Sequence, residues 1–566
     1  MRRLLRVNLS TQQWAWEEMP NEYKNQGGHA LLNMIICNEV PPTSDPLGPE
    51  NKLIFAPGVL AGTTVANCNR LFVGGKSPLT GGIKEANSGG TAALLLARMG
   101  IAALIIEGKA EGLTKVLINK AGVLLEDAGD LKGLGNYDLI KKFKDYAGVI
   151  SIGQAGERMN LSAGVAAFTK DLHPRMAARG GLGAVMGSKN LKAIVIDDTG
   201  VGRVELPEQV REEFKATAKV FNKGILSFPL MEGMRAFGTP ILVGLVQSLC
   251  ALPTKNFREG TFDGFNKISG EYMMELSQKR PNFKMQHRCT EGCLISCSNM
   301  VTDDQGNEIV CGIEFETIAL LGSNCLIDDL DAIAMINRIC NDVGADTMEV
   351  GCALAIAMDA GLLAWGDAAG AVAMSKEMAE GTEHGNMLAN GAYYTGKKLG
   401  IERIPVVKKQ ALAGYDPRVL KGTGVTYSTS PQGADHTSGS CLPSPGTPYN
   451  HLSSENQHLM SQMLQRHNAA IDALGLCLFP MLAIIGNPEL SGLLVKLTSM
   501  VLGEELAPSY LNDLGAGMLA MEKQYNLAAG FTKEDDRLPD YFSKEALPPM
   551  NTVFDVPEKD LDAVIL

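Results

Sequence analysis

The alternation of apolar and polar residues predicts that the first third of the chain is rich in β-strands. Residues 4–9 and 14–18 alternate with a period of two around a short polar turn, which is typical of a β-hairpin. Glycine-dense stretches at 73–90 and 179–187 indicate loops, and the alanine-rich segment 90–99 indicates a helix. Further strands are predicted where short runs of aliphatic residues occur, at 52–55, 103–107, 115–118 and 192–196.

After about residue 205 the apolar positions recur every three to four residues, which predicts amphipathic helices. The segment 331–343 places its isoleucines and Cys340 on one stripe, and Gly344 follows as a suitable C-terminal cap. The stretch 414–450 is rich in Gly, Ser, Thr and Pro and predicts a long loop, which in a compact protein is usually functional. The other predicted helices lie at 208–220, 347–363, 368–380, 459–472 and 488–502.

This order of patterns predicts an α+β protein of several domains. A chain of 566 residues is too long for one hydrophobic core. We expect a β-rich N-terminal base domain at 1–205, followed by two mainly α-helical domains at 206–405 and 406–566.

Composition narrows the classes of function. A net charge of −12 disfavours generic binding of nucleic acid, which depends on neutralising phosphates. The N-terminus lacks the apolar core of a signal peptide, and no uncharged apolar stretch reaches the roughly 18 residues that a membrane span needs. We therefore expect a cytoplasmic protein without a membrane span, in which disulfides are disfavoured and most of the 12 cysteines are buried thiols.

Four cysteines form the most specific pattern in the chain. Cys289, Cys293 and Cys297 are four residues apart, and Cys477 is remote. Three clustered thiolates and one distant thiolate supply one ligand for each iron of a [4Fe–4S] cluster. Zinc and structural thiols are the alternatives, although a zinc ribbon usually offers two CxxC pairs and no second pair is present.

Two glycine-rich strings come close to phosphate-binding motifs without matching them. Residues 74–77 end like a P-loop, but Arg70 stands where the first glycine would be. Residues 179–189 depart from the dinucleotide fingerprint in their spacing. Glycine N–H groups flanked by four basic residues suit a phosphorylated ligand, and plain tight turns are the alternative; the basic residues are Arg70, Lys76, Arg175 and Arg179.

Several strings resemble the tungsten-containing aldehyde:ferredoxin oxidoreductase family. They occur in the family's order over roughly residues 1 to 480, and together they are specific. Three departures stand out: the cysteine spacing is one residue longer than is common, Asn341 replaces an aspartate, and His29 replaces an arginine. The matching strings lie at 45–51, 76–81, 86–90, 179–193, 314–317, 341–346, 415–418 and 472–477.

This resemblance implies a cofactor in which two pterin dithiolenes hold tungsten or molybdenum and a magnesium ion bridges the pterin phosphates. The matching positions fall into four sets. They are Arg70 and Asn87 for the phosphates and magnesium; Ala177, Ala178, Arg179, Gly180 and Gly181 for the backbone that completes that site; Asn341 and Asp346 for one pterin, with Asp472 and Leu476 for the other; and Cys289, Cys293, Cys297 and Cys477 for a [4Fe–4S] cluster.

The resemblance also implies a reaction. His436 matches a histidine beside the metal and Glu314 a carboxylate that acts there, with Glu316 as its competitor; such groups would move the protons of an aldehyde oxidation. Electrons would leave through the cluster to a ferredoxin or a small iron–sulfur subunit, in a homodimer or a hetero-oligomer.

Two alternatives remain open at this point. Related tungsten enzymes reduce aromatic acyl-CoA thioesters within larger complexes and bind the metal through a protein cysteine, for which Cys311 and Cys325 are candidates. A non-catalytic iron–sulfur electron-transfer subunit is the alternative of another class, but it would have no use for the pterin motifs or for His436 and Glu314.

Overall fold

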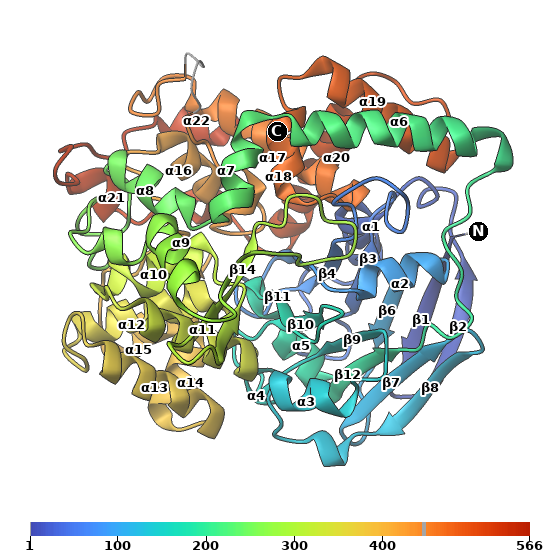
Figure 1. The fold of residues 1–566 in the computed structure, drawn as a ribbon, viewed down its shortest axis with the longest axis horizontal. Coiled ribbons are helices and arrows are strands. Elements are labelled where there is room, and N and C mark those ends of the chain that lie inside the picture. Colours follow the sequence, from blue (N-terminus) through green and yellow to red (C-terminus); the bar gives the residue numbers. More distant parts are fainter. Residues whose placement is uncertain (1, 444–448, 566) are drawn as a thin grey trace.

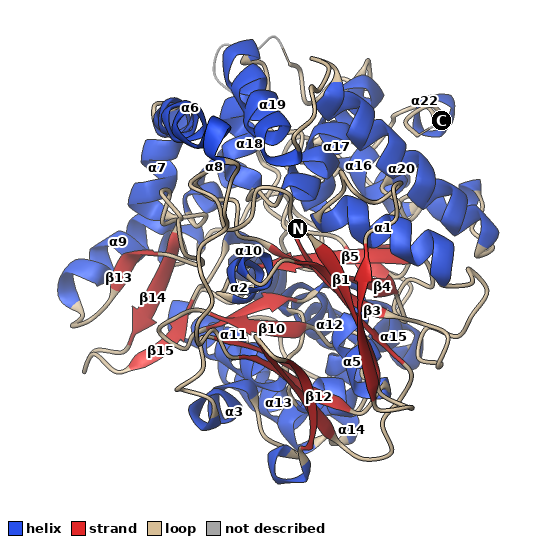
Figure 2. Cartoon of the chain, turned by 90° about the vertical axis from the view of Figure 1, so that its right-hand side faces the viewer, coloured by secondary structure: helices blue, strands red, loops and turns tan. Residues whose placement is uncertain are grey.

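The computed structural model describes residues 2–443 and 449–565. The chain builds two six-stranded sheets within its first 200 residues and is mainly helical afterwards (Figure 1). This order confirms the expected α+β class with a β-rich N-terminal part. Seen from the side, the sheets occupy the lower part of the molecule, and most of the long helices lie above and beside them (Figure 2).

The first sheet has the strand order β2-β1-β6-β3-β4-β5. Its strands are β1 Arg3–Asn8, β2 Gln13–Glu18, β3 Leu53–Pro57, β4 Leu71–Lys76, β5 Ile83–Ser88 and β6 Ile101–Glu107. Strands β1 and β2 form the predicted hairpin. Along β3, Leu53 and Phe55 pack with helix α2 (Ala92–Arg98) while Ile54 packs with α1 (Gly28–Glu39), because alternate side chains point to opposite faces of a sheet.

The prediction of a glycine-dense loop at 73–90 is wrong over most of its length, because β4 and β5 pair there as antiparallel strands on either side of a turn at 77–82. Gly75 stands in β4 because the backbone of Lys52 is so close that a Cβ atom would lie 2.6 Å from its carbonyl oxygen. The loop predicted at 179–187 is also wrong over most of its length, because a 3-10 turn at Arg179–Gly181 leads directly into helix α5 (Leu182–Ser188).

The second sheet has the order β11-β10-β9-β12-β7-β8 and shares a hydrophobic core with the first. Residues of α2 and α5 lie in that common core, together with Ile150 of β9 and Ile194 of β12. The elements of this part are β7 Thr114–Asn119, β8 Gly122–Asp127, α3 Asn136–Lys142, β9 Gly148–Ser151, α4 Gln154–Glu157, β10 Val165–Phe168, β11 Pro174–Ala177 and β12 Leu191–Ile196.

The helical part contains a small sheet that the sequence patterns did not predict, formed by β13 Lys284–His287, β14 Ser298–Thr302 and β15 Glu308–Cys311. The strands β16 Val406–Val407 and β17 Gln410–Ala411 form a short hairpin. The helices are α6 Glu208–Leu226, α7 Pro229–Phe237, α8 Ile241–Ser248, α9 Gly270–Lys279, α10 Phe315–Leu321, α11 Leu330–Val343, α12 Thr347–Asp359, α13 Ala368–Glu380, α14 Glu383–Ala389, α15 Gly391–Leu399, α16 Lys421–Thr429, α17 Gln457–Leu474, α18 Leu478–Ile484, α19 Pro488–Leu502, α20 Tyr510–Ala528, α21 Tyr541–Lys544 and α22 Glu558–Asp562.

The helical segments exchange partners across the sequence. Helix α6 runs beside α19 along one edge of the molecule (Figure 1), and Phe221 of α6 lies in the same core as Leu494 of α19. Conversely, Phe542, Leu547 and Phe554 near the C-terminus complete the core around α10 and α12. Neither helical half therefore has a core made only of its own residues.

The long loop predicted at 414–450 is wrong between 421 and 429, where the buried helix α16 lies; residues 444–448 lie outside the described residues. Gly, Ser and Thr are weak helix formers, so packing rather than propensity holds α16. The hydroxyls of Ser428 and Thr429 bond to carbonyl oxygens four residues earlier, at 3.0 and 2.8 Å, and so remain satisfied in the interior.

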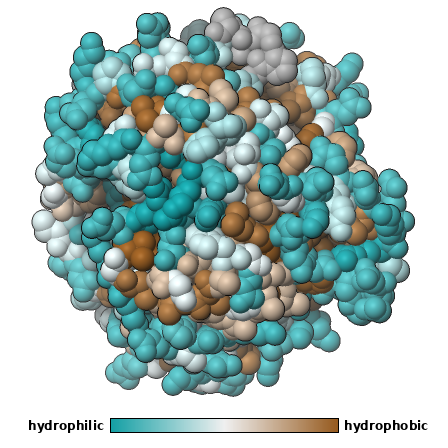
Figure 3. Space-filling model, turned by 90° about the vertical axis from the view of Figure 1, so that its left-hand side faces the viewer, coloured by the Kyte–Doolittle hydropathy of each residue, from teal (hydrophilic) through white to brown (hydrophobic). Residues whose placement is uncertain are grey.

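On the face drawn in Figure 3, hydrophobic side chains form patches separated by polar ones. Among the described residues, none of the helices combines the length and the apolar character needed to cross a bilayer.

Candidate functional site

The predicted site residues lie where strand β5, at the edge of the first sheet, meets the loop that carries His436 and the ends of α11 and α17. On β5, Lys84 pairs with Asp435 of that loop at 3.0 Å. Arg179 donates to the carbonyl oxygen of Ala434 at 3.2 Å and lies 3.3 Å from Asp346. The structure thus joins three regions that are far apart in the sequence.

Arg70 and Asn87, the expected phosphate-binding residues, contact each other directly. Arg70 precedes β4 and Asn87 lies on β5, and the Nε atom of Arg70 donates to Asn87 Oδ1 at 2.9 Å. Burial alone would lower the pKa of Arg70, but the nearby thiols of Cys477 and Cys289 raise it above its ordinary value. A permanent positive charge therefore faces the cysteines and the cofactor region together.

The glycine pair after Arg179 supplies a backbone shape that other residues cannot adopt easily. Gly180 and Gly181 have φ angles of 81° and 76°. A Cβ atom on Gly180 would collide with the side chain of Lys84, and Ser77 Oγ donates to Gly180 O at 2.7 Å. Ala177 ends β11 and Ala178 precedes the turn, so the expected backbone segment is continuous.

Asp346 caps the N-terminus of α12, where its Oδ1 accepts from the Met348 N–H at 2.9 Å. Its Oδ2 has no hydrogen-bond partner although the residue is only 2% exposed. Asn341 lies in the last turn of α11, and its carbonyl oxygen accepts from Asn136 at 2.8 Å. Asp346 Oδ2 lies 3.3 Å from Arg179 Nε without a hydrogen bond, so it can still accept from a donor on a ligand.

Asp472 and Leu476 flank the end of α17. The chain turns at Gly475, which has a φ angle of 89° and packs tightly on Gly58. Leu476 is fully buried, and the Arg70 N–H donates to Gly475 O at 3.1 Å. The turn therefore carries Cys477 directly away from Asp472 toward the other three cysteines.

Asn67 links Cys477 to the cysteine cluster. Its carbonyl oxygen accepts from the Cys477 N–H at 2.8 Å, and its Nδ2 donates to Cys293 Sγ at 3.4 Å. Asn67 has a positive φ of 60°, a conformation that asparagine tolerates, but no sequence signal marked it. The structure thus brings the four predicted cysteines together.

The cysteines differ in their electrostatics. A hydrogen bond from Cys293, with Arg70 and Arg175 nearby, lowers the pKa of Cys289 to about 5, while burial raises the pKa of Cys477 to about 11. Thiolate is the form that binds metal, and two arginines favour it here.

His436 pairs with Glu316 rather than with Glu314. His436 Nε2 lies 2.9 Å from Glu316 Oε1, and Tyr415 donates to the same oxygen at 3.3 Å. Burial opposes both charges, but the pair more than compensates: the pKa of His436 lies above and that of Glu316 below its ordinary value.

Glu314, the expected catalytic carboxylate, faces the cysteine side. Its Oε2 accepts from Thr239 Oγ1 at 2.6 Å. Burial raises its pKa to about 7, and the charge of Cys289 contributes in the same direction. It is therefore a proton-holding group close to the cysteines, at neutral pH divided between its two protonation states.

The ion pair between His436 and Glu316 makes the free energy of unfolding depend on pH. The contribution of the raised His436 pKa is fully present below about pH 6.5 and is lost as pH rises through the raised pKa of the folded protein. That of the lowered Glu316 pKa is fully present above about pH 4.5 and is lost as pH falls through the lowered pKa. We expect the difference in thermal unfolding midpoint between wild type and His436→Asn to be largest between about pH 4.5 and 6.5. A difference that stays constant from pH 4 to 9 would argue against the pair.

Cys311 and Cys325, the alternative metal ligands, already have partners. Cys311 Sγ accepts from Arg175 at 3.3 Å, and the Cys325 thiol donates to Leu320 O at 3.3 Å within a buried core.

The side chains at the centre of this region keep accessible surface although protein surrounds them. The exposed side-chain fractions are 19% for Asp472, 15% for Glu316 and 13% for His436. We infer that they line an internal space. Its cationic donors suit phosphates, and its unpaired carboxylate oxygens suit N–H groups, so the residues present fit a pterin-type cofactor.

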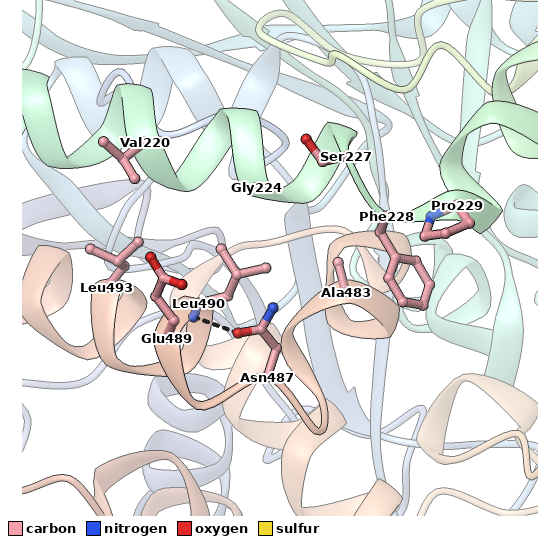
Figure 4. A pocket seen from close by; sticks show the side chains of 10 residues that line it. All are labelled: Val220, Gly224, Ser227, Phe228, Pro229, Ala483, Asn487, Glu489, Leu490 and Leu493. Carbon is pink, nitrogen blue, oxygen red and sulfur yellow. Dashed lines mark hydrogen bonds between the residues drawn. The ribbon is translucent and has the colours of Figure 1, made fainter. Parts of the chain in front are cut away.

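The groove in Figure 4 is a different feature. It lies between α6 and α19, with a volume of about 270 Å³, and is lined mainly by apolar residues such as Phe228 and Leu490. It contains none of the predicted site residues.

Comparisons with known proteins match almost the whole chain. Family models of aldehyde ferredoxin oxidoreductase match residues 4–198 with its N-terminal domain and residues 216–564 with its domains 2 and 3. The tungsten-containing aldehyde ferredoxin oxidoreductases of Pyrococcus furiosus and Thermococcus kodakarensis are each 32% identical to this chain, over 96% of it and 92% of their own length. The WOR-like subunit of aliphatic sulfonate oxidoreductase from Pyrococcus furiosus is 28% identical over 78% of this chain and 76% of its own length.

A solved structure is also similar in fold. A chain of the active-site complex BamBC of benzoyl coenzyme A reductase, in complex with 1,5-dienoyl-CoA, matches with a TM-score of 0.78. The match covers 99% of this chain and 92% of that chain at 19% identity.

Proposed function

Because the chain belongs to the aldehyde ferredoxin oxidoreductase family, we propose that it oxidises an aldehyde to the carboxylic acid. The observation that carries this proposal is the His436–Glu316 pair at 2.9 Å, in the buried region described above. An acid–base pair beside a cofactor chamber is what removal of protons from a hydrated aldehyde requires.

We assign the residues of the chamber to a bis-pterin cofactor of tungsten or molybdenum. Arg70, Asn87 and the 177–181 backbone would hold the phosphates and a bridging magnesium ion. Asp346 and Asn341 would hold one pterin, and Asp472 and Leu476 the other. When bound, the cofactor supplies the two-electron redox chemistry; the protein orients it and sets the local charge.

Within this scheme the protein's own groups have separate tasks. His436 and Glu316 would hold a proton between them near the substrate and pass it on, and Tyr415 donates to Glu316 at 3.3 Å beside them. Glu314, on the cysteine side, holds a proton near the thiolates. Asn67 and the turn at Gly475 keep Cys477 in line with Cys289, Cys293 and Cys297, which would bind a [4Fe–4S] cluster.

The electrons would leave singly from that cluster to a ferredoxin or a small iron–sulfur subunit. Support for a separate partner comes from the relatives whose names describe a subunit or a complex. The alternative, reduction of an aromatic acyl-CoA with a cysteine on the metal, is less well supported because the relatives that are 32% identical are named aldehyde ferredoxin oxidoreductases, whereas the benzoyl coenzyme A reductase chain is 19% identical.

Anaerobic purification followed by elemental and pterin analysis tests the proposal. We expect one tungsten or molybdenum, two pterins and four irons per chain, and aldehyde-dependent reduction of a viologen dye. Iron and sulfide without pterin would instead indicate an electron-transfer subunit. Sulfur from a protein side chain in the coordination sphere of the metal would favour the acyl-CoA reductase.

Replacing Cys477 with serine tests the cluster assignment. We expect the variant to lose the [4Fe–4S] electron paramagnetic resonance signal and dye-linked turnover, because a hydroxyl is a poor substitute for a thiolate. Cys37→Ser, at a partly buried thiol on α1, is the matched control and should keep both. Four irons retained in the Cys477 variant would remove this residue from the ligand set.

A further inference from the structure

Three potential metal ligands converge at the boundary between the first sheet and the C-terminal helices. They are His29 in the first turn of α1, Glu85 on β5 and Asp472 near the end of α17, and one ligand atom of each lies within 4.8 Å of the others. We propose that they bind one divalent transition-metal ion of the zinc type, distinct from the pterin-held metal and from the bridging magnesium.

The first support is that two of these side chains present unpaired atoms in the interior. His29 is 4% exposed and Glu85 7% exposed, yet neither His29 Nδ1 nor Glu85 Oε1 has a hydrogen-bond partner. Buried polar atoms are almost always satisfied, so two unpaired atoms in one small cluster indicate a missing ligand.

The size of the cluster selects an ion over a larger ligand. Three atoms that all lie within 4.8 Å of one another leave room at their centre for a single atom. Zinc binds nitrogen and oxygen at about 2.0–2.2 Å, which these side chains reach by moving inward slightly. A pterin ring is too large to occupy the space between these three atoms.

The surroundings of His29 are those of a metal-binding histidine. Its Nε2 lies 2.6 Å from Glu522 Oε1, on α20, while its Nδ1 faces Asp472 Oδ2 at 3.8 Å. A carboxylate on the far ring nitrogen fixes the tautomer and leaves the near nitrogen free to bind metal. Asn33 and Gln432 each donate to the same Glu522 oxygen at 2.7 Å and hold it in place.

In a second cluster of potential metal ligands, an arginine side chain already contacts the ligand atoms. His173, His287 and Cys311 also lie within 4.8 Å of one another. There, Arg175 Nη2 donates to His287 Nδ1 at 2.9 Å and to Cys311 Sγ at 3.3 Å, so a guanidinium already takes the central position and repels cations. This cluster therefore provides a matched control.

The proposed ion would tie α1, β5 and α17 together. Asp472 is five residues before Cys477, so the ion would also steady the turn between the second pterin and the cluster. Its removal should loosen the contact between the sheet and the C-terminal helices.

The test is metal analysis of the full-length protein, purified anaerobically and incubated with Zn²⁺. Wild type and His173→Gln should each bind one zinc per chain, whereas His29→Gln and Glu85→Gln should bind none. X-ray absorption at the zinc edge should report only nitrogen and oxygen ligands. In wild type, chelation should lower the thermal midpoint and Zn²⁺ should restore it, which is a measurement that needs no variant.

Three results would overturn the proposal: no zinc in wild type, zinc retained in both His29→Gln and Glu85→Gln, or sulfur ligands at about 2.3 Å, which would place the zinc on cysteines. Tungsten or molybdenum and pterin contents, measured on the same samples, report on the proposed oxidoreductase function separately. That function can therefore stand or fall independently of this site.

Discussion

Replacing His436 with asparagine will lower aldehyde turnover by about 10²- to 10⁴-fold, the range that a positioned acid–base group contributes. Asparagine keeps a hydrogen-bonding side chain of similar reach but cannot carry the proton. His436 lies 2.9 Å from Glu316, so Glu316→Gln should also slow the reaction. The measurement is steady-state turnover with a viologen dye, together with metal and pterin content.

The matched control is His467→Asn, on α17, where the half-buried residue contacts the Met463 carbonyl oxygen through its ring at 2.8 Å. This variant should keep full activity. If His436→Asn retains wild-type turnover with normal cofactor content, His436 has no part in proton transfer. If the cofactor content falls with the rate, the histidine serves to hold the cofactor.

Replacing Lys84 with methionine will destabilise the protein by about 3–5 kcal/mol, the cost of leaving one member of a buried ion pair without its partner. Lys84 has no exposed surface and lies 3.0 Å from Asp435, which is 5% exposed. Lys84 also donates to the Gln432 carbonyl oxygen at 3.1 Å, so its loss should release the His436 loop from β5 as well.

The double variant Lys84→Met with Asp435→Asn isolates the pair. Removing both charges should recover part of the lost stability, because no uncompensated charge is then buried. Thermal unfolding midpoints of the four proteins give the coupling. Additive losses would mean that the two side chains do not interact. Lys141→Met, at an exposed pair with Asp138, should change the midpoint little.

Regular elements with one apolar face could be predicted from the sequence. Helices α13 and α19 begin and end at the predicted residues, and α11 ends at Gly344, which has the left-handed conformation expected of a cap. The β1–β2 hairpin was equally clear, because period-two alternation on both sides of a polar turn leaves few other structures.

The sequence-based predictions fail where glycine, serine and threonine allow close packing and do not form turns. Gly75 sits inside a strand because a neighbouring backbone is close, and α16 is held by burial against weak propensities. The backbone contact at Gly75 and the burial of α16 both depend on residues far away in the sequence, so local sequence patterns do not reveal them.

The candidate site likewise has features that could be predicted from the sequence and features that could not. The four cysteines could be grouped because their chemistry is distinctive. Which glutamate pairs with His436 could not be predicted: Glu314 and Glu316 are two residues apart at the start of α10, and the helix turn directs them to different neighbours. The sequence pattern predicts a loop around Lys84, and loop lysines are usually exposed. The buried pair of Lys84 with Asp435 therefore could not be predicted.

The exchange of segments between the helical halves bears on how the protein matures. Phe542, Leu547 and Phe554 are synthesised well after α10 and α12, yet they complete the core around these helices. Helix α6 is likewise synthesised before α19, with which it shares a hydrophobic core. The walls of the chamber thus cannot close during synthesis, which leaves an interval after translation in which a bulky, preassembled cofactor can be inserted before the protein seals around it.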